Sequence, residues 1–414
     1  MSALAITVAA LLLAAAPQQD PRPTLPGPQA DGTTLLPNGW RLAPHGAQVP
    51  LPSDLPVRSA LHPGGRWLAI QHAGYRKHQV TLFDTQTGAV AGTVPLTRTW
   101  SGLAWSPDGG TLYASGGVDD LVRVFGFDAA TGAATARSTL PIGDATQLDL
   151  PAGMCVHAGG DLLIALQRRH AVARVHPDGT EVWRTALPAN SFPYECALHP
   201  DGETVFVSLW GSAAVAVLGA GDGALRTTIA AGPHPSEMLL DEDGDRLFVS
   251  NANENTVSVV DTALGKVTET LSTALYPMAP PGSTPNALAL SPDGEFLVVA
   301  NADNNNCAVF EVEHPGKSRS LGFVPVGFYP TSVRFSADGA SLFVANGKGS
   351  LGSRANPDGP APGKKAGGPD DYTGSMFAGS LSTFALPDGE ALAQLTARAY
   401  ACCPLRPAAC SGAR

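Results

Sequence analysis

The strongest constraint on this chain is a short structural unit that recurs along most of its length. Its clearest copy is residues 287–301 (ALALSPDGEFLVVAN), where apolar residues alternate before a turn and a β-rich run follows it. Alternation with a period of two is typical of half-buried strands, and Asp293-Gly294 supplies the positive-φ position of a tight hairpin. Each unit is therefore predicted to contain an antiparallel pair of strands joined by this turn.

Equivalent turns recur at intervals of 42 to 51 residues. They end at Gly65, Gly109, Gly160, Gly202, Gly244, Gly294 and Gly339. Intervals of roughly 40–50 residues match a four-stranded propeller blade, whereas a helical repeat would show a period of 3.6 residues, which these segments lack. Third strands are then expected at residues 79–84, 121–127, 171–175, 213–218, 256–261, 307–312 and 380–386.

A single blade leaves apolar sheet faces uncovered, so the units are expected to stack around a ring. We therefore predict an all-β fold, a seven-bladed β-propeller with four antiparallel strands per blade, over residues 35–396. Ring closure usually joins the two ends of the chain in one blade. Residues 40–52 and residues 390–396 could each supply the closing strand, and the sequence does not choose between them.

The overall charge argues against a nucleic-acid partner. The 414-residue chain has 26 Lys and Arg against 36 Asp and Glu, a formal net charge of −10, whereas nucleic-acid binding depends on basic surfaces. Hydrophobic residues make up 44% of the chain, which is typical of a folded protein. The expected partner is a protein or a small-molecule ligand at a propeller face.

The N-terminus predicts export. Residues 3–16 are almost wholly apolar, a run too short to span a bilayer but suited to the core of a signal peptide, and small residues for cleavage end it. We predict a signal peptide over residues 1–17, a Pro-rich linker over residues 18–34, and a periplasmic or extracellular location in a bacterium. The alternative is a buried N-terminal helix. No other run approaches membrane-spanning length, so no integral membrane segment is expected in the mature chain.

The repeats resemble a known family. Residues 247–261 (LFVSNANENTVSVVD) resemble the YVTN repeat, and residues 297–301 and 342–346 repeat the theme. The resemblance implies a YncE-like seven-bladed propeller. The order of an LPNGWRL segment, a propeller and a last-blade insert is similar to bacterial proteins in which such a propeller precedes a phosphoesterase of the alkaline-phosphatase superfamily. It implies that a phosphoesterase domain belongs to a longer parent.

The C-terminal residues 397–414 show no repeat pattern, yet they hold three of the six cysteines. We expect an irregular tail that reads like out-of-frame translation of GC-rich DNA. The hypothesis that follows is that this chain is the propeller half of a longer parent, truncated by a frameshift. The alternative is a metal-binding or disulfide-bonded tail, but its cysteines have no regular ligand spacing. The three cysteines inside the repeats are expected to be small buried hydrophobes.

Catalytic and cofactor motifs are not found. Four histidines, His62, His157, His176 and His199, stand first in hairpin turns, where a polar side chain helps to close the turn. The others show no ligand spacing, and neither a nucleophile elbow nor a phosphate-binding loop occurs. We therefore predict no catalytic residue, no metal site and no cofactor in this chain.

Candidate binding residues lie where inner strands begin or second strands end, because loops there line the mouths of the central channel. Seven are expected near one mouth or on the channel wall: Trp100, Tyr194, Glu195, Glu237, Asn286, Tyr329 and Arg334. Five are expected near loop turns: His72, Arg168, Asn251, Asn301 and Asn346. The alternative for each is structural, since Asn often bonds the backbone of turns and Tyr-Pro pairs often pack between blades.

An insert over residues 348–377 interrupts the last blade. It is rich in Gly and Pro and contains Lys364-Lys365 and Asp370-Asp371-Tyr372. Loops of this length inside a compact fold are usually functional or disordered. An interdomain contact is favoured over a ligand lid, and a plain surface loop is the alternative.

Three functions compete. The first is a non-catalytic exported propeller that acts as a binding or scaffold domain, and the second makes it the accessory domain of a phosphoesterase parent. The third is a stand-alone lactonase-type hydrolase, which would need a base, an arginine and often a metal in one channel. His72, Arg168 and Glu195 could contribute to it, but nothing in their spacing requires that role.

Overall fold

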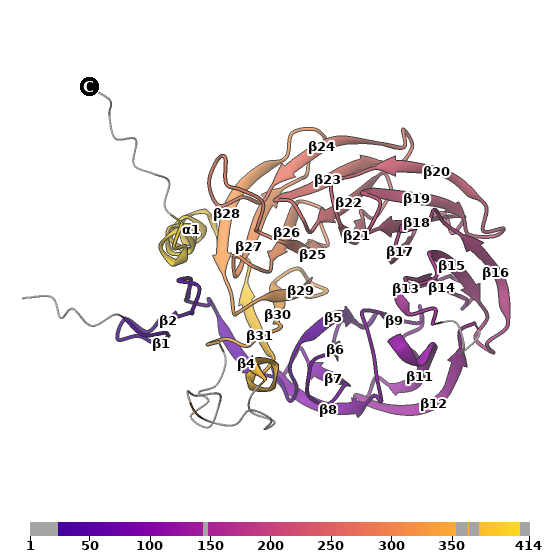
Figure 1. Ribbon diagram of the computed structural model, residues 1–414, viewed down its shortest axis with the longest axis horizontal. Helices are drawn as coiled ribbons and strands as arrows, with labels where there is room; N and C mark the ends of the chain where they lie inside the picture. Colours follow the sequence, from indigo (N-terminus) through magenta and orange to yellow (C-terminus); the bar gives the residue numbers. More distant parts are fainter. Residues whose placement is uncertain (1–23, 144–147, 353–362, 364–371, 406–414) are drawn as a thin grey trace, which may run out of the picture.

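The computed structural model describes residues 24–143, 148–352, 363 and 372–405. Within these residues, seven four-stranded antiparallel sheets surround a central axis (Figure 1), which confirms the predicted seven-bladed β-propeller. The predicted signal peptide lies outside the described residues, as do most of the last-blade insert and the end of the tail. In the described part of the chain, no helix has the length and apolar character needed to cross a membrane.

Six blades are each built from four consecutive strands, with the first strand innermost. Blades 1 to 3 are β5–β8 (Pro56–Leu61, Trp67–His72, Gln79–Asp84, Ala89–Pro95), β9–β12 (Leu103–Trp105, Thr111–Ser115, Leu121–Asp128, Ala133–Pro141) and β13–β16 (Pro151–Val156, Leu162–Leu166, Ala171–Val175, Glu181–Ala186). Blades 4 to 6 are β17–β20 (Pro193–Leu198, Thr204–Leu209, Ala214–Gly219, Leu225–Ala230), β21–β24 (Pro235–Leu240, Arg246–Asn251, Thr256–Asp261, Lys266–Ser272) and β25–β28 (Pro285–Leu290, Phe296–Asn301, Asn306–Glu311, Arg319–Pro325).

The seventh blade closes the ring with a strand from the other end of the chain. It consists of β29 (Pro330–Phe335), β30 (Ser341–Asn346), β31 (Ser380–Ala385) and β4 (Ala47–Pro50). The outer strand β4 pairs antiparallel with β31, and a hydrogen bond of 2.8 Å from Ser382 Oγ to Gln48 Oε1 supports the pairing. Of the two candidate closing segments, the structure therefore uses the one within residues 40–52.

Residues 390–396, the other candidate, are not a strand. They lie in helix α1 (Gly389–Cys402), which starts at an N-cap where Asp388 accepts a hydrogen bond of 2.9 Å from the Ala391 amide. The helix buries Leu392 and Leu395, a spacing that fits a helix and not a strand. The prediction of an irregular tail from residue 397 is therefore wrong as far as Cys402.

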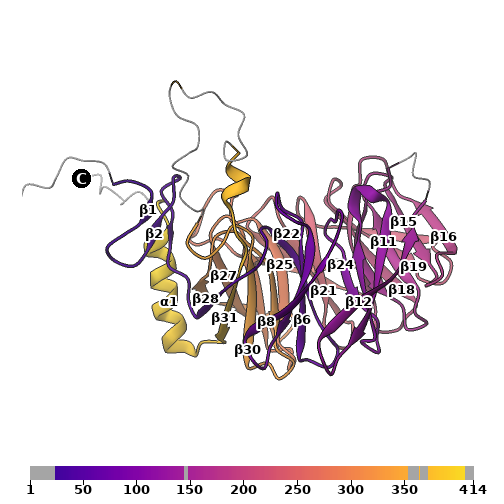
Figure 2. The same ribbon diagram turned by 90° about the horizontal axis from the view of Figure 1, so that it is seen from below.

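Helix α1 packs against β28, the outer strand of blade 6, at the side of the propeller (Figures 1 and 2). The Phe323 amide of β28 donates a hydrogen bond of 2.8 Å to Thr396 Oγ1, so the helix satisfies part of an exposed sheet edge. The approach requires Gly322, because a Cβ there would lie 2.2 Å from Thr396 Oγ1. Helix α1 is therefore an integral part of the fold and not an appendage.

A small three-stranded sheet precedes the propeller. Its strands are β1 (Gly27–Pro28), β2 (Thr34–Leu35) and β3 (Arg41–Leu42). The predicted mobile linker over residues 18–34 is thus partly paired, because β1 and β2 form a hairpin. Two short 3₁₀ helices, η1 (Gly117–Asp119) and η3 (Thr373–Met376), complete the described elements.

In several blades, the side chain just before the third strand ties the blade to the next one on one face of the ring. Asp120 has φ 49° and its Oδ1 accepts amide hydrogen bonds of 3.0 Å from Asp149 and 2.8 Å from Leu150. Asn305, with φ 54°, accepts in the same way from the Tyr329 amide at 3.0 Å. Asp and Asn tolerate this left-handed conformation better than most residues. These contacts fix the loops that enter the inner strands, and Tyr329 on one of these loops lines the cavity described below.

Turn histidines tie the blades together on the opposite face. His62 Nδ1 accepts a hydrogen bond of 2.8 Å from the Gly64 amide, as expected for a residue that closes its own turn. Its Nε2 also lies 3.2 Å from the Gly109 carbonyl oxygen of the following blade, and His199 repeats this contact with Gly244. The sequence indicated the first role and not the second, because the neighbouring turn is about 45 residues away along the chain.

Candidate ligand-binding site at the channel mouth

Most inner strands begin with proline, and this pattern shapes the central channel. The first residues of β5, β13, β17, β21, β25 and β29 are all proline. Proline has no amide hydrogen to donate, so it suits the start of a strand. In each of these strands the pairing register shifts just after the proline, which turns the next side chains toward the axis.

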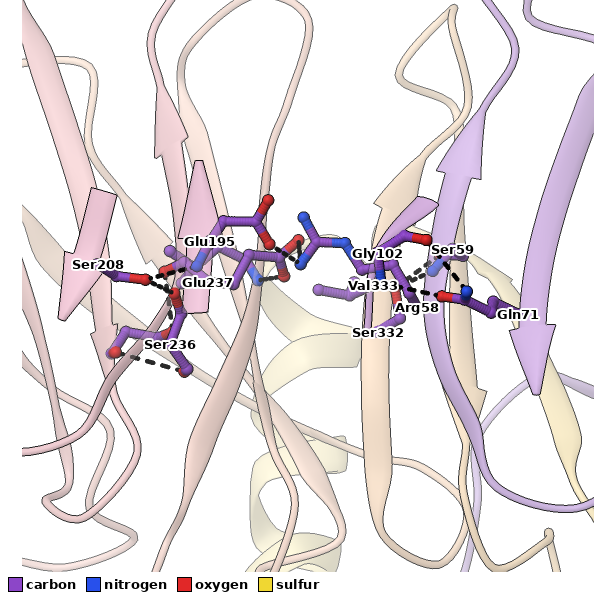
Figure 3. A network of polar contacts seen from close by, with 12 residues as sticks. Arg58, Ser59, Gln71, Gly102, Glu195, Ser208, Ser236, Glu237, Ser332 and Val333 are labelled. Carbon is purple, nitrogen blue, oxygen red and sulfur yellow. Dashed lines mark hydrogen bonds and ion pairs between the residues drawn. The ribbon is translucent and has the colours of Figure 1, made fainter. Parts of the chain in front are cut away.

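The second residue after these prolines carries charge in three blades. Arg58 on β5 forms ion pairs with Glu195 Oε2 on β17 at 2.6 Å and with Glu237 Oε1 on β21 at 3.2 Å, as seen in Figure 3. Arg334 on β29 contacts the same Glu237 oxygen at 2.6 Å. The side chains of Glu195 and Glu237 are 3% and 5% exposed, so this four-residue group, the channel cluster, joins four blades inside the ring.

The environment shifts the pKa values of Glu195 and Glu237 in opposite directions. Burial raises the pKa of Glu195 to about 7, although Arg58 opposes the shift. Burial would also raise the pKa of Glu237, but Arg334 and Arg58 outweigh it and hold the pKa below its usual value. The difference follows from the contacts, because Glu237 touches two guanidinium groups and accepts a further hydrogen bond of 2.9 Å from the Leu288 amide.

Buried serines hold the strands that carry the glutamates. Ser208 Oγ accepts a hydrogen bond of 3.1 Å from the Glu195 amide and donates one of 2.9 Å to the Ser236 carbonyl oxygen (Figure 3). Ser250 Oγ donates at 3.0 Å to the Glu237 carbonyl oxygen. Second strands thus fix the backbone of inner strands, and the glutamate positions are set by the blades themselves.

A cavity of about 320 Å³ opens above the channel cluster. It lies where the loops that enter inner strands meet the loop after β30. Its lining combines apolar, aromatic, hydroxyl and cationic groups: Leu55, Val57, Arg58, Trp100, Ser101, Tyr194, Asn286, Tyr329, Thr331 and Lys348. Neither glutamate of the channel cluster is among them. Arg58 therefore stands between the cavity and the carboxylates.

Lys348 lies among aromatic rings at this cavity. Its Nζ is 3.8 Å from the ring centroid of Tyr329, 5.0 Å from that of Phe328 and 5.9 Å from that of Phe377. Burial lowers the pKa of Lys348, and Asp303 opposes the shift. Among the residues that the structure describes, no carboxylate lies within ion-pairing distance of Lys348, so aromatic rings are its direct partners and Asp303 acts on it from farther away.

The structure brings together seven of the predicted binding residues. Trp100, Tyr194, Asn286 and Tyr329 line the cavity. Glu195, Glu237 and Arg334 form the channel cluster beneath it with Arg58. That any of the seven binds a ligand stays a prediction.

The other five predicted residues lie elsewhere. His72, Asn251 and Asn346 end second strands and turn into their own blades, where each contacts the third residue of the third strand, at 2.9 Å, 3.0 Å and 2.9 Å. Asn301 donates to Asn306 Oδ1 in the same region of blade 6. Arg168 is exposed on the loop after β14. Burial lowers the pKa of His72 to about 4, so it is neutral near pH 7.

Sequence reasoning missed Arg58, Ser101, Thr331 and Lys348. Arg58 stands in a run, PVRSAL, that looks like an ordinary strand with an exposed arginine. The sequence feature that identifies Arg58 is the proline that begins most inner strands, because the two residues after this proline face the channel. Lys348 is the first residue of the predicted insert, of which residues 353–362 and 364–371 fall outside the described part.

The residues present do not suit a metal. A lactonase-type channel would need free carboxylates for a cation, but Glu195 and Glu237 both contact guanidinium groups. Over the described ranges there is no group of three or more His, Cys, Asp or Glu side chains placed to hold a metal ion. We therefore derive no step through a metal.

Comparisons with known proteins agree with the fold. A family model described as the SMP-30/gluconolactonase/LRE-like region matches residues 64–211, and one described as lactonase, 7-bladed β-propeller matches residues 254–353. Regucalcin from Xenopus laevis is 30% identical over 156 residues, which cover 35% of this chain and 51% of regucalcin. The chain therefore matches about half the length of that relative.

Solved structures show the same architecture at low identity. Hydrazine synthase from Kuenenia stuttgartiensis has a TM-score of 0.59 and 19% identity, over 73% of this chain and 96% of that chain. A streptogramin B lyase has a TM-score of 0.56 and 14% identity, over 82% and 98% of the two chains. At such identities the likeness concerns the fold. The chain thus has a propeller fold similar to that of lactonase-type families.

Proposed function

We propose that this protein is a non-catalytic, exported propeller that binds a ligand in the cavity at its channel mouth. One observation carries the proposal: among the described residues that line this cavity there is no carboxylate and no histidine, and Arg58 separates the cavity from Glu195 and Glu237. A general base must reach the proton it removes, within about 3 Å or through one water. A site whose described lining offers cationic, aromatic and hydroxyl groups but neither a carboxylate nor an imidazole is suited to binding.

Two measurements test this proposal together. The full chain should release no product from p-nitrophenyl phosphate or simple lactones above background, with or without added divalent metal. Ligand-observed NMR with a fragment library should detect binding that is lost in Asn286→Trp, which fills the cavity, and kept in the surface variant Lys266→Met. Binding that survives Asn286→Trp in a folded protein would contradict the assignment of the site.

A lactonase-type hydrolase is the second candidate. The two lactonase-type family matches favour it, together with a glutamate of raised pKa beside an arginine. In that case Glu195 would act as the base, and Arg58 would have to move aside. Lactone turnover that disappears in Glu195→Gln and persists in Glu237→Gln would establish this candidate and overturn the non-catalytic proposal.

We further propose that the propeller is YncE-like and serves as the accessory domain of a phosphoesterase parent. The YVTN-like runs and the Asn346-Gly-Lys-Gly segment support this through their resemblance to such proteins. Helix α1 and Cys403 are packed, so we place any change of reading frame after Cys403. Sequencing the gene and transcript across codons 385–414 and downstream tests the proposal. A phosphoesterase-like sequence in another frame would support it, and prompt stop codons in all frames would contradict it.

A further inference from the structure

The cavity at the channel mouth has an excess of positive charge. In the channel cluster, Arg58 and Arg334 balance Glu195 and Glu237. Lys348 adds a cation to the lining. Among the described lining residues there is no carboxylate, and Asp303, which acts on Lys348, lies outside the lining. In a partly buried site such a charge acts more strongly than in water. An anionic group of a ligand would therefore be favoured next to Lys348 and Arg58.

Two polar atoms of the lining lack a partner in the described structure. The indole Nε1 of Trp100 and the amide Oδ1 of Asn286 are both buried, and neither forms a hydrogen bond with a described residue. Buried polar atoms without a partner are costly. Both atoms are covered in this conformation, so a ligand in the cavity supplies the missing partners once the Trp100 and Asn286 side chains rotate toward it. Trp100 requires an acceptor and Asn286 a donor. A ligand that carries both a carboxylate and a hydroxyl group would satisfy the two.

Size and shape narrow the ligand further. A water molecule occupies about 30 Å³ in the liquid, so a cavity of about 320 Å³ has room for roughly ten non-hydrogen atoms. Three aromatic side chains of the lining, Trp100, Tyr194 and Tyr329, offer ring faces and edges to a flat apolar body. A long or strongly branched molecule would not fit among them.

We propose that the cavity lined by Lys348, Arg58, Trp100 and Asn286 binds a compact, planar organic carboxylate that carries a hydroxyl group. This inference rests on the proposed binding function and names the chemical class of its ligand. The carboxylate lies toward Lys348 and Arg58, the flat body lies among the aromatic rings, and the hydroxyl group donates to Asn286 Oδ1. No bond forms or breaks.

Three probes of the same size separate the contribution of charge from that of shape. They are 4-hydroxybenzoate, its neutral analogue 4-hydroxybenzamide and its cationic analogue 4-hydroxybenzamidine, all with the same number of non-hydrogen atoms. Calorimetric titration of the full chain should give about tenfold or tighter binding of the benzoate than of either analogue, the range expected for a charge-assisted contact. Equal or tighter binding of the amide or the amidine would overturn the inference.

Variants at Lys348 complete the test. Lys348→Met should weaken binding of the benzoate about tenfold or more and change binding of the amide less than twofold, whereas Lys348→Arg should keep the preference for the anion. Lys266→Met, on the exposed outer strand β24, is the matched control for loss of a lysine. An unchanged benzoate affinity in a folded Lys348→Met protein would refute the proposed orientation.

The outcomes distinguish this inference from the proposed function. Binding of the amide alone, abolished by Asn286→Trp, would overturn the anionic ligand class and leave a binding cavity. Failure of all three probes to bind at 10 mM would also overturn the ligand class, and the fragment screen would then decide whether the cavity binds anything. Release of product from a lactone would overturn the proposed function without bearing on the preference for anions.

Discussion

The buried carboxyl group of Glu195 should make the stability of this protein depend on pH. Burial raises its pKa from 4.5 to about 7, so the folded state favours the neutral acid. A pKa raised on folding contributes stability that is fully present below pH 4.5 and is lost as the pH rises through about 7. At about 1.4 kcal/mol per pKa unit, this group should lower the free energy of unfolding by about 2 to 3 kcal/mol between pH 5 and pH 8.

The perturbation is Glu195→Gln, which keeps the shape of the side chain and removes its titration. Equilibrium unfolding in urea, followed by tryptophan fluorescence at several values between pH 5 and pH 8, gives the free energy of unfolding of each protein. The difference between wild type and Glu195→Gln should change by about 2 to 3 kcal/mol across this range, with the wild type losing stability as the pH rises. Other titrating groups cancel in the difference.

Glu237→Gln is the matched control. Burial would raise the pKa of Glu237, but Arg334 and Arg58 lower it overall, so its contribution is lost only as the pH falls below 4.5. Its removal takes away a like charge that raises the pKa of Glu195, so the loss of stability between pH 5 and pH 8 should become smaller but keep its sign, whereas Glu195→Gln should abolish it. Parallel curves for wild type and Glu195→Gln, or a wild type that gains stability with rising pH relative to that variant, would refute the reasoning.

Three further predictions concern the blades and the helix. Asp120→Ala should lower the free energy of unfolding by about 1 to 3 kcal/mol, because two amides lose their acceptor. Asp178→Ala, on an exposed turn, should change this free energy little. Equal effects of the two variants in urea titrations would contradict the prediction. Leu395→Ala should loosen α1, so that the buried thiol of Cys402 reacts faster with Ellman's reagent, whereas an unchanged rate would show that α1 does not depend on this contact. Burial lowers the pKa of His72 from 6.5 to about 4, so the stability that the neutral imidazole contributes is lost as the pH falls through this range. His72→Gln should therefore move the midpoint of acid unfolding to lower pH. A midpoint that stays or rises would refute this prediction.

Much of the fold follows from local chemistry that can be read in one blade. The hairpin turn around Gly294 needs a positive φ of 74°, and the strands beside it alternate, so the unit and its repetition are visible in the sequence. The prediction of a possible closing strand at residues 390–396 is wrong. Leu392 and Leu395 have helical spacing and Asp388 is a good N-cap, so the local sequence favours helix α1. Closure by β4 depends on contacts between the ends of the chain, which no local pattern encodes.

The site could be predicted only in part, because it depends on which face of a strand meets the axis. Tyr194 and Glu195 are predicted because they open an inner strand, and the structure places both on the inner strand β17. Asn251 and Asn346 end second strands, and their side chains turn into the blade toward third-strand serines instead of toward the channel. Arg58 is the second residue after the proline that begins six inner strands, a pattern that extends over several blades and is absent from the run PVRSAL alone.

The most direct test of the binding site is a crystal structure of the full chain soaked with 4-hydroxybenzoate. The account predicts the benzoate in the cavity beside Trp100 and Tyr194, with its carboxylate within hydrogen-bonding distance of Lys348 and its hydroxyl group toward Asn286. An empty cavity at saturating ligand, or a carboxylate that points away from Lys348, would contradict it.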